Sequence, residues 1–117
     1  MRTPKTCTEY CLNPDGAFRG DFEGMYLNIA DPLGHELNKS SLNNRIFIDI
    51  IFDGDNHFER ILDLGCGLGG LLNLVTTTNK GGYSLGLDIS CTAITKARDL
   101  YPALNFQCID IRKNPLQ

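Results

Sequence analysis

Three aspartates of this 117-residue sequence each follow a short apolar run, and the first of them leads into a cluster of glycines. The residues concerned are Asp63, Asp88 and Asp110, with Gly65, Gly67, Gly69 and Gly70 in the cluster. Glycine lets the chain turn sharply and lets a ligand approach the backbone, while a carboxylate attracts cations and accepts hydrogen bonds. Asp88 or Asp110 alone could equally be a turn or cap residue. The joint pattern favours a ligand site where the strands end.

The glycine cluster satisfies two patterns that bind different ligands. Gly65, Gly67 and Gly70 match the dinucleotide fingerprint G-x-G-x-x-G, whereas Asp63 followed by the glycines matches D-x-G-x-G-x-G. A pyrophosphate is bound by the N–H groups and dipole of a helix N-terminus, and a carboxylate just before the loop would repel it. The second pattern is typical of loops that bind S-adenosylmethionine. This ligand carries a sulfonium and an ammonium, which Asp63 would attract. Charge therefore favours the second pattern.

The segment Asp63-Leu64-Gly65-Cys66-Gly67-Leu68-Gly69 resembles motif I of the Rossmann-like, class I S-adenosylmethionine-dependent methyltransferases. The resemblance runs from about Glu59 to Asp110 and corresponds to the N-terminal part of that family's domain. It implies an enzyme that transfers a methyl group from its cofactor, S-adenosylmethionine, to a small-molecule acceptor. The cofactor-binding residues that it implies are Asp63, Gly65, Cys66, Gly67, Gly69, Asp88, Ile89, Asp110 and Ile111.

The resemblance also implies a role for the residues at the strand ends. Asp63 would help to place the methionyl group, and Asp88 would accept hydrogen bonds from both ribose hydroxyls, for which a carboxylate has paired lone pairs. Ile89 would pack against the adenine ring. Asp110 would take the adenine amino group, and the backbone N–H of Ile111 would face a ring nitrogen.

An aromatic-rich segment lies upstream of the glycine cluster. Residues 22–26 and 31–34 are similar to the N-terminal segment of small-molecule methyltransferases related to nodulation protein S, in which an aromatic-rich helix lies over the cofactor. Those relatives generally have tryptophan where this chain has Leu33. Tyr26 is a candidate lid residue over the cofactor, with simple packing of its ring as the alternative.

The elements that must position these residues alternate between strand and helix, which predicts an α/β fold with right-handed crossovers. We expect helices at about 22–29 and 41–52, and strands at 58–64, 83–88 and 104–109 joined by two further helices. The predicted class is a Rossmann-like parallel sheet flanked by helices, incomplete, with strand order 3-2-1. Residues 1–40 would form an irregular or helical N-terminal segment, and residues 41–117 a truncated S-adenosylmethionine-binding domain.

We expect three strands to make an incomplete domain of this family, one that would lack the part that builds the acceptor pocket. The first strand would then present an unpaired apolar edge, which could pair with another chain or be covered by the N-terminal segment. A non-catalytic Rossmann-like module that serves as an interaction surface is therefore an alternative to the enzyme. A nicotinamide-dependent oxidoreductase is a third possibility, supported by Gly65-x-Gly67-x-x-Gly70 and opposed by Asp63 and Asp110.

Composition and charge limit the other classes of function. The formal net charge is −3 and the 11 Lys and Arg residues are scattered, so no basic surface favours nucleic acid as a partner. No apolar run reaches the roughly 18 residues that cross a bilayer, and no signal peptide is recognisable. We expect a cytoplasmic protein without a membrane partner.

Five cysteines are an odd number, and three of them fall in the turn, helix and strand of one sheet, so we expect free thiols. Cys7 and Cys11 have a spacing that could begin a metal site, but no second pair of ligands follows, and we predict no metal. His35 and His57 are expected in solvated loops. Because methyl transfer from a sulfonium is an in-line displacement that depends on positioning, no catalytic base is assigned.

Overall fold

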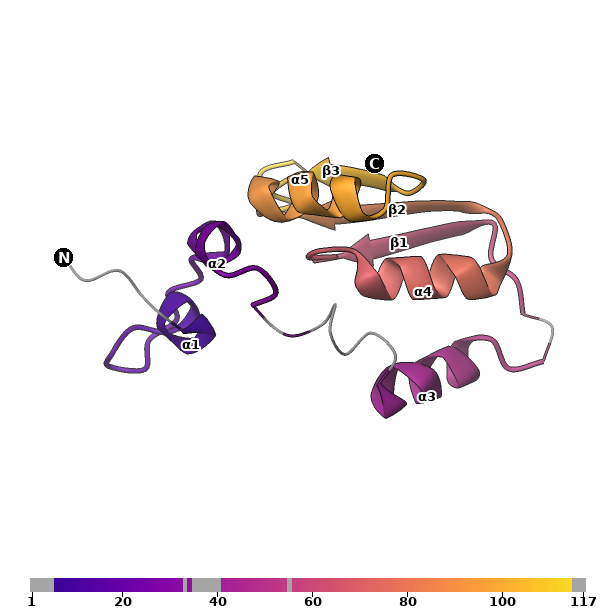
Figure 1. Ribbon diagram of the computed structural model, residues 1–117, viewed down its shortest axis with the longest axis horizontal. Helices are drawn as coiled ribbons and strands as arrows, with labels where there is room; N and C mark the ends of the chain where they lie inside the picture. Colours follow the sequence, from indigo (N-terminus) through magenta and orange to yellow (C-terminus); the bar gives the residue numbers. More distant parts are fainter. Residues whose placement is uncertain (1–5, 33, 35–40, 55, 115–117) are drawn as a thin grey trace.

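The computed structural model describes residues 6–32, 34, 41–54 and 56–114, which form a three-stranded parallel sheet with helices around it (Figure 1). The strands are β1 (Arg60–Leu64), β2 (Tyr83–Asp88) and β3 (Asn105–Cys108), and β2 lies in the middle. The order β1-β2-β3 is the expected order 3-2-1 viewed from the other edge. The predicted α/β class with a Rossmann-like parallel sheet is confirmed.

Each pair of neighbouring strands is joined by a helix, as parallel strands require. α4 (Gly70–Asn79) follows β1, and its N-cap Gly69 has φ 89°, which glycine adopts without strain. α5 (Cys91–Leu100) follows β2, and the Ser90 hydroxyl caps it by accepting a hydrogen bond from Ala93 N. Both helices therefore begin at the carboxyl edge of the sheet, beside the predicted site residues.

Helices cover one face of the sheet, and the other face is open at the edge strand β1, although Leu87 of β2 on that face is 2% exposed. Successive side chains of a strand alternate between faces, and the register places Ser84 and Phe106 together on one of them. There they are 5% and 6% exposed, beneath α4 and α5. Leu62 and Leu64 of β1 lie on the opposite face and are 48% and 52% exposed. The core between the sheet and its helices is made of Leu72, Ile94, Ala97 and Phe106.

Two short helices, α1 (Cys7–Cys11) and α2 (Phe22–Asn28), precede the sheet, and α2 packs against α5. α2 was expected, but α1 was not identified, although Thr6 and Glu9 have the spacing of a capping box. The Thr6 hydroxyl accepts a hydrogen bond from Glu9 N, which starts the helix. A second core cluster consists of Tyr10, Met25, Tyr26, Leu68 and Ala93. The N-terminal helices therefore share a core with the glycine loop and α5.

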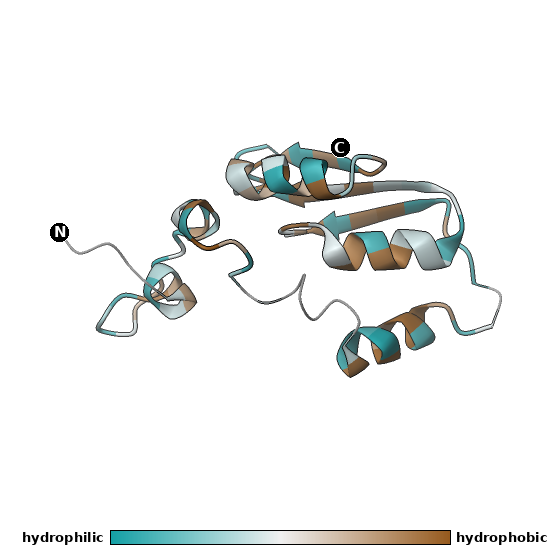
Figure 2. Ribbon diagram, viewed as in Figure 1, coloured by the Kyte–Doolittle hydropathy of each residue, from teal (hydrophilic) through white to brown (hydrophobic). Residues whose placement is uncertain are grey.

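A third helix, α3 (Leu42–Ile51), begins after the N-cap Ser41, as the predicted helix at 41–52 requires. It contacts α4, yet none of its residues is buried. Parts of the α3 ribbon are brown in Figure 2, which marks its apolar residues. Among these, Leu42 is 68% and Ile50 is 71% exposed. α3 therefore adds an apolar surface rather than a core. The division of the chain at residue 40 remains a prediction.

The cysteines correct one expectation. Cys91 and Cys108 form a disulfide, with their Cα atoms 5.1 Å apart, so the prediction of free thiols is wrong for this pair. The reason is the topology, because α5 begins at the same sheet edge at which β3 ends, and this brings two cysteines of different elements together. Cys7, Cys11 and Cys66 are free, as expected.

Candidate functional site

A cavity of about 390 Å³ opens at the carboxyl edge of the sheet. Its walls come from the strand ends, from α2 and from the turn after β3. The lining residues are Phe22, Tyr26, Leu64, Gly65, Leu87, Asp88, Ile89, Ile109, Asp110, Ile111 and Arg112. Six of the ten predicted site residues are among them: Tyr26, Gly65, Asp88, Ile89, Asp110 and Ile111. The other four, Asp63, Cys66, Gly67 and Gly69, do not line the cavity.

Asp88 ties two parts of the cavity wall together. Its Oδ2 accepts a hydrogen bond from Gly67 N at 2.8 Å, and its Oδ1 accepts one from Ser90 N at 2.9 Å. The residue is only 9% exposed. Because each carboxylate oxygen has two acceptor lone pairs, each retains one for a ligand. Asp88 can therefore hold the glycine loop against the start of α5 and still accept two further hydrogen bonds.

The glycine loop between β1 and α4 turns sharply and packs closely. Gly65 has φ 77° and Gly67 has φ 56°, both in the left-handed region. The N–H groups of Gly65 and Cys66 donate to Leu87 O at 2.8 and 2.9 Å, which fixes the loop to β2. A Cβ on Gly67 would lie 2.7 Å from the Tyr26 hydroxyl oxygen, closer than real side chains approach. The loop therefore leaves no room for a larger residue at position 67.

Asp63 is partly buried on the covered face of β1. Burial raises the pKa of its carboxyl group, and the negative charge of Asp88 raises it further. Among the residues that the structure describes, none forms a hydrogen bond or an ion pair with the Asp63 side chain. Two neighbouring carboxylates, of which one has no protein partner, favour a positively charged ligand.

Tyr26 packs against the glycine loop and Cys66 is part of that loop, and both keep their protons. Burial, with the charge of Asp88, raises the pKa of Tyr26 to about 12. The same two causes raise the pKa of the Cys66 thiol to about 12. Neither group is therefore a base or a nucleophile at neutral pH.

Asp110 and Arg112 form an ion pair at the cavity. Arg112 Nε donates to Asp110 Oδ1 at 3.0 Å, and a terminal guanidinium nitrogen donates to Oδ2 at 2.8 Å. These hydrogen bonds hold the pKa of Asp110 down to about 2, so its carboxylate is charged at neutral pH. Ile89 and Ile111, 44% and 45% exposed, add apolar surface to the same cavity. Apolar walls with a charged acceptor suit a flat heterocycle that carries an amino group.

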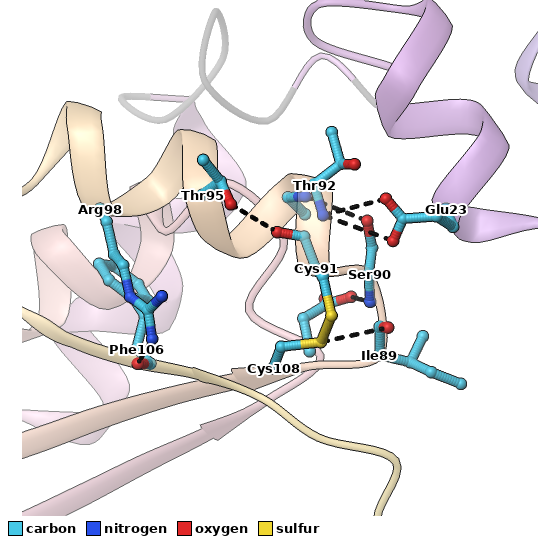
Figure 3. Close-up of a disulfide and its surroundings, with 11 residues drawn as sticks. Glu23, Ile89, Ser90, Cys91, Thr92, Thr95, Arg98, Phe106 and Cys108 are labelled. Atoms are coloured by element: carbon cyan, nitrogen blue, oxygen red, sulfur yellow. Dashed lines mark hydrogen bonds between the residues drawn. A yellow bond between two sulfur atoms is a disulfide. The ribbon is translucent and has the colours of Figure 1, made fainter.

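Sequence reasoning did not identify Glu23 or Arg112 as part of this region. Glu23 Oε1 accepts a hydrogen bond from Thr92 N at 3.0 Å, so a residue of α2 caps the N-terminus of α5 (Figure 3). Lys96 of α5 in turn donates to the backbone oxygen of Tyr26. The Glu23 contact spans 69 residues, and no local sequence pattern encodes such a contact.

The remaining candidates lie away from the cavity or outside the described residues. His57 is exposed in the loop before β1, as expected. His35 and Leu33 fall outside the described residues. Within the described ranges, no group of three or more potential metal ligands lies together. No helix of those ranges is long and apolar enough to cross a membrane.

Comparison with known sequences identifies one relative. No protein-family model matches the chain. The chain is 30% identical over 71 residues to "Putative methyltransferase 235L" of Invertebrate iridescent virus 6. The match covers 61% of this chain and 26% of the viral protein, so the chain spans about a quarter of that relative's length.

Solved structures share the fold over larger parts of the chain. An S-adenosylmethionine-dependent methyltransferase from Clostridium acetobutylicum ATCC 824 has a TM-score of 0.57 and 19% identity, over 79% of this chain and 39% of its own. The PH0226 protein from Pyrococcus horikoshii OT3 has a TM-score of 0.55 and 25% identity, over 78% and 44%. The plantazolicin methyltransferase BpumL, solved in complex with a pentazolic desmethylPZN analog and SAH, has a TM-score of 0.50 and 28% identity, over 90% of this chain and 38% of its own.

These comparisons establish the fold. The chain has the fold of the Rossmann-like S-adenosylmethionine-dependent methyltransferases, and the resemblance first visible in its glycine loop is confirmed. It spans less than half of each protein compared.

Proposed function

We propose that this chain is the cofactor-binding part of an S-adenosylmethionine-dependent methyltransferase that acts on a small-molecule acceptor. The observation that carries the proposal is Asp88, whose carboxylate organises the cavity wall and retains one free lone pair on each oxygen. The cavity of about 390 Å³ falls within the roughly 300–1,000 Å³ of small-molecule sites. Its chemistry suits a ligand with adjacent hydroxyls, a flat ring and a positive charge.

Each part of S-adenosylmethionine has a matching group among the described residues. The ribose hydroxyls would donate to Asp88. The methionyl ammonium would be attracted by the charge of Asp63, which does not line the cavity and has no partner among the described residues. The adenine ring would pack against Ile89, with its amino group donating to Asp110 and a ring nitrogen accepting from the N–H of Ile111. When bound, the cofactor supplies a methyl group that its sulfonium activates.

The chain's own contribution to the reaction would be positioning. Phe22 and Tyr26 of α2 line the cavity and would help to exclude water from the bound cofactor. Tyr26 and Cys66 keep their protons at neutral pH, so neither would take a proton from the acceptor. Holding the donor in line with an acceptor can by itself supply much of the rate of a methyl transfer.

The dinucleotide alternative is less compatible with the same contacts. A pyrophosphate would need free N–H groups in the glycine loop, and the N–H of Gly67 already donates to Asp88. The guanidinium of Arg112 is held by Asp110. Asp63 and Asp88 add negative charge next to the loop. An anionic cofactor would therefore be repelled where a cationic one is attracted.

The test is a calorimetric titration of the chain with S-adenosylmethionine and, separately, with NAD. Asp88→Asn is the test variant, because the amide fills the same space but loses the charge and one acceptor oxygen. Asp99→Asn is its matched control, since Asp99 is exposed on α5 outside the cavity. We expect S-adenosylmethionine to bind and NAD not to bind. Asp88→Asn should weaken binding by about tenfold or more, because a lost hydrogen bond to a charged group costs about 1.5–3 kcal/mol.

If the Asp88 and Asp99 variants bind S-adenosylmethionine with equal affinity, Asp88 does not contribute to the site. Binding of NAD in place of S-adenosylmethionine would overturn the proposal. Circular dichroism of both variants before titration separates lost binding from lost folding.

An interaction module remains the second candidate, and the exposed Leu62 and Leu64 of β1 favour it. We propose that the free edge of β1 pairs with another polypeptide and that the protein works in the cytoplasm. Light scattering over a range of concentrations tests self-pairing, which would appear as a mass that rises with concentration. Folded monomers at all concentrations, together with binding of S-adenosylmethionine, would favour the enzyme instead.

A further inference from the structure

The Cys91–Cys108 disulfide, drawn in Figure 3, joins two neighbouring segments that both supply residues to the cavity wall. Cys91 is the first residue of α5, and Cys108 is the last residue of β3, 17 positions later. Ile89 precedes Cys91 by two positions, and Ile109 directly follows Cys108. Both isoleucines line the cavity. The bond therefore ties the end of β3 to the start of α5 immediately next to the candidate site.

The wall beyond β3 depends on this connection. Ile109 N donates to Asp88 O at 2.9 Å, and after that contact the chain leaves the sheet. Asp110 and Ile111, which would bind adenine, follow in a turn and lie two and three positions beyond Cys108. Among the backbone hydrogen bonds of the described residues, no other joins residues 109–112 to β2. A covalent bond at its base restricts how far the adenine-binding residues can move.

The bond is also open to reagents. Cys91 is exposed, whereas the free thiols of Cys7, Cys11 and Cys66 are half-buried. Disulfides that are found in proteins of a reducing compartment are usually transient, with a catalytic or redox-sensing role. An exposed disulfide beside a cofactor site, in a protein that we place in the cytoplasm, therefore suits regulation better than permanent stabilisation.

We propose that Cys91 and Cys108 form a redox switch that controls the affinity of the cavity for S-adenosylmethionine. This inference rests on the proposed function. A dithiol reductant attacks Cys91 Sγ with one thiolate, which forms a mixed disulfide and releases Cys108 as a thiolate. The second thiol of the reductant displaces Cys91, and the reductant leaves as its own disulfide. Two electrons and two protons pass to the protein, which then holds two thiols.

The oxidised state is the binding state. Once the bond is reduced, residues 109–112 are less restricted, and a ligand must order them when it binds. Linkage requires the reverse effect as well, because a ligand that prefers the oxidised chain must stabilise the disulfide by the same factor. A tenfold difference in affinity corresponds to about 30 mV in the potential of this two-electron couple.

The experiment compares the full chain in its oxidised and reduced states. Alkylation in denaturant first counts the thiols, and we expect three in the oxidised chain and five after dithiothreitol. Calorimetry with S-adenosylmethionine then measures affinity in both states, and we expect it to be about tenfold weaker after reduction. Bound cofactor should lower the disulfide potential by about 30 mV in dithiothreitol redox buffers.

Two variants complete the design. Cys91→Ser with Cys108→Ser should bind like the reduced chain whether or not reductant is present. Cys11→Ser is the matched control, because Cys11 is a free thiol outside the cavity, and it should respond to reductant as the unmodified chain does. Hydrogen exchange should locate the effect of reduction at residues 88–92 and 108–112.

The outcomes separate the two proposals. Five alkylatable thiols after mild oxidation would overturn the switch, because the bond would not form. Equal binding of S-adenosylmethionine in both states would overturn the switch and leave the proposed function intact. No binding in either state, with the disulfide formed and the chain folded, would overturn the proposed function and the switch with it.

Discussion

The two faces of the sheet carry similar apolar residues but have different surroundings. On the covered face Phe106 is 6% exposed beneath α4 and α5, whereas Leu64 on the open face is 52% exposed. The same contrast extends to α3, where Ile50 is 71% exposed. Burial of apolar area stabilises a fold by about 25 cal/mol per Å², so the covered face supplies the stability. The open face and α3 leave an apolar surface available for another partner.

The largest expected effect is the loss of stability when a core leucine is truncated, compared with truncation of an exposed isoleucine of α3. Leu72 is 1% exposed in the core, and Leu72→Ala should lower the free energy of unfolding by about 3 kcal/mol. Ile50→Ala should change it by less than about 0.5 kcal/mol. Urea unfolding followed by circular dichroism measures both. An Ile50→Ala variant as unstable as Leu72→Ala would show that the face of α3 is buried in solution.

Two glycines with similar backbone conformations sharpen the comparison. Gly67 has φ +56° and faces the Tyr26 hydroxyl, while Gly54 has φ +69° with open space around it. Gly67→Ala should cost about 2–3 kcal/mol from strain and overpacking together, and Gly54→Ala about 1 kcal/mol from strain alone. Tyr26→Phe should recover part of the Gly67→Ala loss, because it removes the clashing oxygen. No recovery in this double-mutant cycle would contradict the packing of Tyr26 on the loop.

The contact between α2 and α5 gives a smaller effect that depends on pH. Burial by itself would raise the pKa of Glu23, but hydrogen bonds from Thr92 outweigh it and lower the pKa below its usual 4.5. An acid with a lowered folded-state pKa stabilises the fold above that value, and the contribution is lost as pH falls through the folded-state pKa. Glu23→Ala should cost about 1 kcal/mol at pH 7 and less at pH 3.

Denaturant titrations at both pH values measure the Glu23 contribution. Glu59→Ala, at an exposed position just before β1, is the control for loss of a carboxylate outside this contact. A Glu23→Ala penalty that is the same at pH 3 and pH 7 would argue against a charged cap.

The smallest expected effect is a gain in stability on substitution of Asp63. The pKa of Asp63 is raised by burial and by Asp88, so the folded state binds this proton more tightly than the unfolded state does. Stability should therefore fall as pH rises through the window above the unfolded-state pKa of about 3.9. Asp63→Asn should raise the free energy of unfolding at pH 7 by about 0.5–1 kcal/mol and weaken binding of S-adenosylmethionine.

Unfolding and calorimetry on the same Asp63→Asn preparation test both statements. Greater stability with unchanged affinity for S-adenosylmethionine would show that Asp63 does not contribute to the proposed site. Lower stability would contradict the unfavourable burial of its charge.

The local signals in the sequence were sufficient for the three strands and for the helices from α2 onward, but α1 was missed. Apolar periodicity, the caps at Ser41 and Ser90 and the glycines after β1 act within a few residues, so they can be recognised in one dimension. The family resemblance carried by the glycine loop and the upstream aromatic segment implied ten site residues, and six of them line the cavity. The sequence did not show that Asp63 and Gly67 would fail to line the cavity. The direction of a side chain from the sheet and the packing of the loop depend on the neighbouring strands and on Tyr26.

The sequence by itself determined an α/β chain with parallel strands, a glycine loop and acids at the strand ends, because propensity, capping and hydrophobic period are local properties. Tertiary structure decided which of these groups meet. It paired Cys91 with Cys108, set Glu23 on the start of α5 and placed Arg112 against Asp110 at the cavity. It also left Leu62 and Ile50 exposed while burying Leu72. These outcomes depend on how crossovers and helices pack in three dimensions, and contacts between distant residues leave no pattern along the chain.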